Sequence, residues 1–67
     1  MNTHPYQQRV VDEKAALDEK IVLLTQFMEL ASFHALVDAA EADLLNRQHD
    51  AMSDYSRVLT ERIAAFV

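Results

Sequence analysis

The chain has 67 residues, contains neither cysteine nor glycine, and carries a formal net charge of −5. A domain of this size buries only about 60 % of the surface that its unfolded chain exposes, and without disulfides or a metal centre the remaining source of stability is assembly with other copies. The absence of glycine excludes the phosphate-binding loops of P-loop and Rossmann proteins, and the excess of acidic over basic residues argues against duplex DNA as a partner.

Neither a membrane span nor a signal peptide is expected. No apolar run approaches the ~20 residues of a membrane-spanning helix, and residues 1–5 lack the basic flank and apolar core of a signal peptide. The sequence therefore predicts a protein without a membrane partner that resides in the cytoplasm.

From Pro5 onward, apolar side chains recur at helical spacing, and nothing breaks the helix before about residue 30. Thr3 or His4 is expected near the N-cap, and Pro5 suits the first turn, where its missing N–H costs nothing. The pattern predicts a first helix over about residues 5–30. Its apolar positions are Val10, Leu17, Ile21, Leu24, Phe27 and Met28.

The connector that follows loses this periodicity. Ser32 is expected to cap a short helical turn, with Phe33 and Leu36 covering the end of the hairpin. Asp38 then opens a capping box, so the sequence predicts a second helix over about residues 38–66. Its apolar stripe consists of Leu44, Leu45, Met52, Tyr55, Leu59, Ile63 and Phe66.

Two helices of similar length joined by a short link form an antiparallel pair. A single seam between two helices cannot enclose an apolar stripe more than ~100° wide, so other copies of the chain are expected to cover the remainder. The predicted fold is all-α, a single domain over residues 1–67 in which an antiparallel two-helix hairpin assembles into a homo-oligomeric helical bundle.

Charged side chains interrupt the apolar face of the first helix. Arg9, Glu13 and Lys20 fall on the face that also carries Tyr6, and a buried charge is costly unless it is paired or binds something. In one interpretation Arg9 and Glu13 form an intrahelical pair while Lys20 extends to the rim. In the other, Tyr6 stacks on a base, Arg9 and Lys20 contact phosphate, and Glu13 orients Arg9, in a ligand site between copies.

The second helix also carries polar groups close to its stripe. Gln48 is interpreted as a structural amide, and Arg62 is open to either a structural or a ligand-binding role. His49 is expected to be a rim or core histidine, because no suitable metal ligand stands three or four residues further on. No nucleophile, base and acid can be combined within one hairpin, so neither an enzyme nor a cofactor is expected.

Two segments of the first helix carry a resemblance to a known family. They are residues 6–14, with the sequence YQQRVVDEK, and residues 17–21, with the sequence LDEKI; the stripe of residues 44–66 agrees as well. In these segments the chain resembles the helical-hairpin family of phage anti-CBASS and anti-Thoeris sponges, over nearly its whole length. It is shorter than the better-known sponges, with few residues before Tyr6.

The resemblance implies a phage or prophage protein of immune evasion that acts in the host bacterial cytoplasm. Such proteins bind and sequester cyclic di- or trinucleotides or cyclic ADP-ribose isomers without degrading them, as homo-oligomers, often hexamers, with pockets between protomers. It implies that Tyr6 stacks on a base and Lys20 contacts phosphate. For Arg62 it implies a basic residue of a second pocket for larger cyclic nucleotides.

Two other functions stay open. A short antiparallel hairpin also resembles the plasmid copy-number regulator that dimerises and binds RNA hairpins, although the basic residues here are spread along the sequence. In a pure protein-interaction module, Arg9, Glu13 and Lys20 would form salt bridges between chains only.

Overall fold

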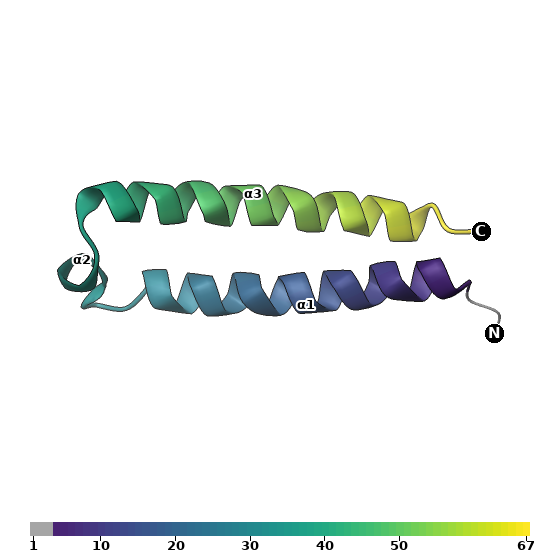
Figure 1. Cartoon of the computed structure of the whole chain (residues 1–67), viewed down its shortest axis with the longest axis horizontal. Coiled ribbons are helices and arrows are strands. Elements are labelled where there is room, and N and C mark those ends of the chain that lie inside the picture. The colour runs from purple at the N-terminus through teal and green to yellow at the C-terminus, as the bar shows by residue number, and fades with distance from the viewer. Residues whose placement is uncertain (1–3) are drawn as a thin grey trace.

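The computed structural model describes residues 4–67, which form the helices α1 (Pro5–Met28), α2 (Phe33–Leu36) and α3 (Ala39–Ala64). The long helices α1 and α3 lie side by side and antiparallel, so both termini are at one end, the open end, and α2 is at the other, the closed end (Figure 1). The molecule is thin, with extents of 50 × 16 × 13 Å. The predicted all-α class is confirmed.

The helix boundaries follow from residues at their ends. His4 is the N-cap of α1 and Pro5 its first residue, whereas the alternative cap Thr3 lies outside the described residues. Asp38 caps α3 as expected, since its Oδ1 accepts a hydrogen bond of 2.8 Å from the Glu41 N–H. Both long helices end about two residues earlier than predicted, at Met28 and Ala64.

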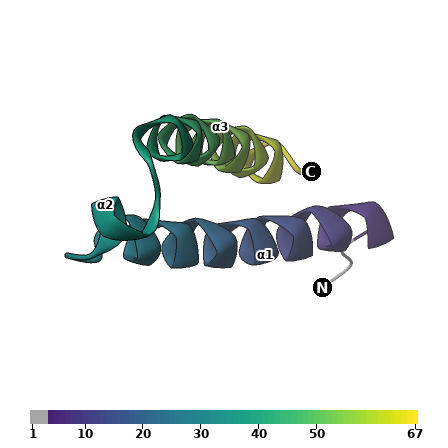
Figure 2. The ribbon, with the colours of Figure 1, turned by 60° about the vertical axis from the view of Figure 1, so that its left-hand side comes forward.

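The core is a single seam between α1 and α3. Val10 and Leu17 of α1 pack with Leu59 of α3, which is only 1 % exposed. Around them lie the half-buried side chains of Ile21, Met52, Ile63 and Phe66. Figure 2 shows that α3 is inclined against α1 rather than strictly parallel to it. A core of this size leaves most of the chain at the surface, as expected for a two-helix structure.

Phe33 of α2 closes one end of the seam. It is buried and packs edge-on against Phe27 of α1, with ring centroids 5.4 Å apart at 82°. Leu36 was expected to share this role, but that prediction is wrong, because its side chain is 61 % exposed. Ser32 stands at the N-cap of α2 without a side-chain capping bond.

Candidate ligand-binding flank

The seam divides the hairpin surface into two flanks. In α1 the seam residues follow one another at spacings of four and three; they are Val10, Lys14, Leu17 and Ile21. The residue before each seam position lies on one side of the seam, and the residue after it lies on the other side. Because α3 runs antiparallel and faces α1, the positions that precede its seam residues lie on the same side as those of α1. The two flanks differ sharply in their chemistry.

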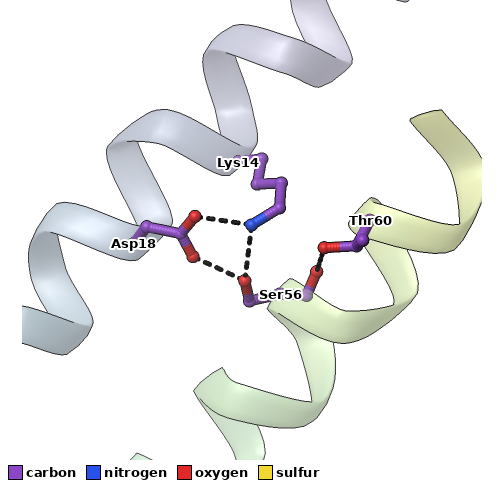
Figure 3. Close-up of polar contacts among 4 residues, drawn as sticks. All are labelled: Lys14, Asp18, Ser56 and Thr60. Carbon is purple, nitrogen blue, oxygen red and sulfur yellow. Dashed lines mark hydrogen bonds and ion pairs between the residues drawn. The ribbon is translucent and has the colours of Figure 1, made fainter. Parts of the chain in front are cut away.

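One side, which we call the hydrogen-bonded flank, joins the helices through polar side chains. Figure 3 shows its centre, where Lys14 and Asp18 of α1 meet Ser56 of α3. Lys14 Nζ donates to Asp18 Oδ2 at 2.6 Å and to Ser56 Oγ at 3.1 Å, and Ser56 Oγ donates to Asp18 Oδ1 at 2.5 Å. The three groups therefore satisfy one another and fix the register of the helices.

This arrangement affects the acidity of Asp18. The hydrogen bond from Lys14, then that from Ser56, lowers the pKa of the Asp18 carboxyl below its ordinary value, because both favour the ionised form. Asp18 therefore remains a carboxylate, and the network stays intact, at neutral pH.

A second contact on the same flank lies nearer the closed end. Thr25 Oγ1 donates to the Ile21 carbonyl at 2.8 Å and lies 2.8 Å from His49 Nε2. Because the single hydroxyl hydrogen is used toward Ile21, His49 Nε2 carries a hydrogen and donates to Thr25. His49 is half-buried, and its prediction as a structural rim histidine is confirmed.

The opposite side, which we call the cationic flank, carries all five candidate ligand residues. They are Tyr6, Arg9, Glu13 and Lys20 of α1 and Arg62 of α3, each of them exposed. Tyr55 and Val58 of α3 lie on the same flank and are also exposed. In the single hairpin, Arg9, Glu13 and Lys20 therefore lie beside the core and not within it. In α1 the polar residues that enter the seam are Gln7, which follows Tyr6, and Lys14, which follows Glu13.

The ion pairs separate the six basic residues of the sequence into two groups. Lys14, Arg47 and Arg57 each pair with an aspartate three or four residues away. Within residues 4–67, Arg9, Lys20 and Arg62 have no ion pair, and all three belong to the cationic flank. The intrahelical Arg9–Glu13 pair is thus not formed. The four charged candidate residues, three cations and one acid, have a net charge of +2 (3 − 1), whereas the whole chain carries −5.

The open end of the cationic flank gathers aromatic and cationic groups. The Tyr6 ring contacts the edge or face of Phe66 in a T-shaped geometry with centroids 5.9 Å apart, and it stacks with His4 at 6.1 Å. The contact between Tyr6 and Phe66 sets the level of the two antiparallel helices. Arg9 is one turn after Tyr6 and Arg62 is one turn before Phe66, so Arg9 and Arg62 lie at about the same level. Tyr6 remains 51 % exposed, so much of its ring is open to a ligand.

Lys20 does not belong to this group. It lies fourteen residues after Tyr6, which is about 21 Å along the helix axis at 1.5 Å per residue. Its level along the seam is between the Ser56 contact and the His49 contact, on the flank that also carries Tyr55, which is 45 % exposed. Within one chain, Tyr6 and Lys20 therefore lie at different levels of the cationic flank.

The single hairpin has no enclosed site in the part of the chain that the structure describes. Residues 4–67 form no pocket, and their histidine and acidic side chains include no group of three able to hold a metal ion. None of the described helices combines the length and apolar character needed to cross a membrane. The cationic flank is therefore an open surface.

The basic residues are visible in the sequence, but the side chains that they contact are not. Lys14 and Lys20 are equivalent in a one-dimensional reading, and the distinction depends on Ser56, which lies 42 residues after Lys14. The expectation that the basic residues are scattered is also incomplete, because folding gathers three of them on one flank. Tyr55 could have been found from its spacing of seven residues to Arg62, which places both on one helical face.

Comparison with known proteins places the chain in a family. The Sequestin family model matches residues 4–65. An uncharacterized 7.5 kDa protein from the denB-rIIB intergenic region of Enterobacteria phage T4 is 43 % identical over 61 residues, which cover 91 % of this chain and 94 % of that protein. No solved structure matches the chain. The expected resemblance to a sponge-type phage family is thus confirmed, and the chain belongs to the Sequestin family.

Proposed function

We propose that the protein binds cyclic nucleotide second messengers of bacterial immunity and sequesters them without degrading them, as a phage or prophage counter-defence protein in the host cytoplasm. The observation that carries this proposal is that Arg9, Lys20 and Arg62, which have no ion pair within residues 4–67, share the flank that also exposes two tyrosines. The family name and the phage relative support a sequestering role.

The chemistry of the flank suits a nucleotide. An exposed tyrosine ring offers a flat surface on which a base stacks, and arginine and lysine donate charge-assisted hydrogen bonds to phosphate oxygens. Tyr6, Arg9 and Arg62 supply both elements within the open-end group. Glu13 lies one turn after Arg9, the spacing at which a carboxylate can accept a hydrogen bond from an arginine and orient its guanidinium.

The binding site is shared between copies in this proposal. Because about 21 Å separates Tyr6 from Lys20 along α1, one ligand meets Tyr6 of one copy and Lys20 of another. Two cationic flanks would repel each other if they met without a counter-charge, and the phosphates of a bound nucleotide supply that charge. Assembly into a homo-oligomer thus provides the pocket that a single hairpin lacks.

Binding without turnover is the expected outcome. Among the described residues, the cationic flank brings no nucleophile into contact with a general base, and the one serine in an interhelix network, Ser56, is held by Asp18 and Lys14 on the opposite flank. The ligand is therefore expected to leave the protein chemically unchanged.

A thermal-shift panel tests the proposal. Cyclic dinucleotides, cyclic trinucleotides and cyclic ADP-ribose isomers are each added to the purified protein, and the bound ligand is recovered and identified by mass spectrometry. A binder at one hundred times its dissociation constant stabilises the fold by about 2.7 kcal/mol, which raises the melting temperature, and is recovered intact. No shift with any member, or recovery of a linear product, contradicts the proposal.

The same grouping of cations also favours the RNA-binding alternative, so the panel includes an RNA hairpin. Phosphate contacts by three cations would make RNA affinity fall steeply with salt. A shift with RNA and none with cyclic nucleotides would assign the cationic flank to RNA instead.

A further inference from the structure

Gln7 is the only polar side chain within residues 4–67 that is buried, with 5 % of its surface exposed. It lies in the seam at the open end, one turn before the core residue Val10. Its Oε1 accepts a hydrogen bond of 3.3 Å from the backbone N–H of His4, and the amide thereby takes part in the capping box of α1. A buried amide is costly unless its polar atoms find partners, so the donor half of this group also requires one.

The donor of the Gln7 amide, Nε2, has no hydrogen bond to any of the described residues. None of their side-chain nitrogen or oxygen atoms is fully buried without a partner, so Nε2 reaches the surface of the open end. Because Oε1 is held by the His4 N–H, the amide cannot turn its acceptor outward without breaking the cap. Gln7 therefore presents an oriented N–H donor and no free acceptor.

This donor lies close to the exposed ring of Tyr6. The Tyr6 ring stacks with the ring of His4 at 6.1 Å, and the backbone N–H of the same His4 holds the Gln7 amide. Tyr6 also packs against Phe66, which in turn packs against the core at the end of the seam where Gln7 is buried. The tyrosine ring and the amide donor thus belong to one cluster at the open end.

We propose that Gln7 is a further ligand-binding residue, whose Nε2 donates to an acceptor atom on the edge of the base that stacks on Tyr6. This inference rests on the proposed function and deepens it. Stacking tolerates any base in many orientations because every base has a π-face, whereas a hydrogen bond to the base edge is directional and selects one orientation. The phosphates are left to Arg9 and Arg62, whose charges suit them better than a neutral amide does.

Replacing the donor with an acceptor tests the contact. Gln7→Glu keeps the size of the side chain and the oxygen that caps α1, since glutamate is equally suited to this position of a capping box, but its second oxygen cannot donate. Gln8→Glu is the matched control, because it adds the same charge at the next residue, whose Nε2 donates to Asp12 at 2.9 Å on the other flank.

Both variants are titrated calorimetrically with the cyclic nucleotide that gives the largest thermal shift, after circular dichroism has verified their helicity. We expect Gln7→Glu to bind about tenfold more weakly than Gln8→Glu, because one hydrogen bond is lost and an acceptor faces an acceptor. Equal affinities of the two variants overturn the inference.

A double-mutant cycle separates a contact with the base from a contact with phosphate. Gln7→Met removes the donor and retains most of the side-chain volume, and its effect on affinity is measured alone and together with Tyr6→Ala. If Nε2 holds the base that Tyr6 stacks, the fold-loss caused by Gln7→Met should be much smaller once Tyr6 is truncated, because the base is no longer held in place. Independent losses, as expected for a phosphate contact or a purely structural amide, overturn the inference.

Failure of this inference can be told from failure of the proposed function. A cyclic nucleotide that binds the unmodified protein and binds Gln7→Glu and Gln7→Met equally well contradicts the role of Gln7 alone. No binding of any cyclic nucleotide by the folded, unmodified protein contradicts the proposed function, and the inference with it.

Discussion

Lys14 and Lys20 are six residues apart on the same helix, yet they lie in opposite chemical surroundings. Lys14 is held by Asp18 and by Ser56 of the other helix, whereas Lys20 is exposed and has no ion pair among the described residues. The same contrast holds for the two flanks as a whole. Polar groups on the hydrogen-bonded flank satisfy one another and stabilise the hairpin, while those on the cationic flank remain available to an anion.

The largest change in stability is expected from a substitution in the core, because the core holds together the two helices that carry both flanks. Leu59→Ala truncates the most buried side chain of the seam and should lower the free energy of unfolding by about 2–5 kcal/mol. Urea unfolding followed by circular dichroism measures this loss. Leu44→Ala, at an exposed position of the same helix, is the control, and a Leu59→Ala loss no larger than that of the control would contradict the assigned core.

A smaller effect, confined to binding, is expected from the aromatic group of the cationic flank. Tyr6→Ala should weaken nucleotide binding by about 2 kcal/mol, or roughly thirtyfold, with little change in helicity, because Tyr6 is half exposed. Calorimetric titration provides the affinity. Tyr6→Phe keeps the ring and should retain most of the binding, so an equal loss in both variants would argue against stacking.

The hydrogen-bonded flank should respond in the opposite way. Ser56→Ala removes the group that links Lys14 and Asp18 to α3, and should lower the melting temperature by a few degrees without changing nucleotide affinity. Thermal melts and titrations of one preparation measure both quantities. Reduced affinity at unchanged stability would show that the two flanks are not functionally separate.

The smallest effect is the pH dependence of this network. Because the folded-state pKa of Asp18 lies below its ordinary value of 3.8, its contribution to stability is present above that value and is lost as the pH falls through the folded pKa. The stability difference between the unmodified protein and Asp18→Asn should therefore shrink below about pH 4. A difference that stays constant from pH 7 to pH 3 would contradict the lowered pKa.

The ends of the elements could be predicted from the sequence because local residues determine them. Pro5 and Asp38 mark the starts of the long helices, and Phe33 covers the closed end as expected. The prediction of which side chains face the seam and which lie beside it was less accurate. Neighbouring positions such as Glu13 and Lys14 differ by only about 100° around the helix, and the partner helix decides which of them enters the seam.

The candidate site shows the same limit. All five ligand residues predicted from the sequence lie on one flank. The rise of the helix separates Tyr6 from Lys20 by about 21 Å, as their spacing in the sequence already implies. A basic residue is left without an ion pair according to the contacts between α1 and α3 and the local pairs within each helix, such as that of Arg57 with Asp54. No periodicity within one helix contains that information.

The most direct test compares nucleotide affinity in Lys20→Gln and Lys14→Gln, each titrated with the cyclic nucleotide that produces the largest thermal shift. Both variants remove one positive charge from α1, so they have the same net charge and differ only in the flank. The account predicts that Lys20→Gln binds at least tenfold more weakly, at unchanged stability, and that Lys14→Gln is less stable but binds normally. Equal affinities in the two variants, or a loss confined to Lys14→Gln, would contradict the assignment of ligand binding to the cationic flank.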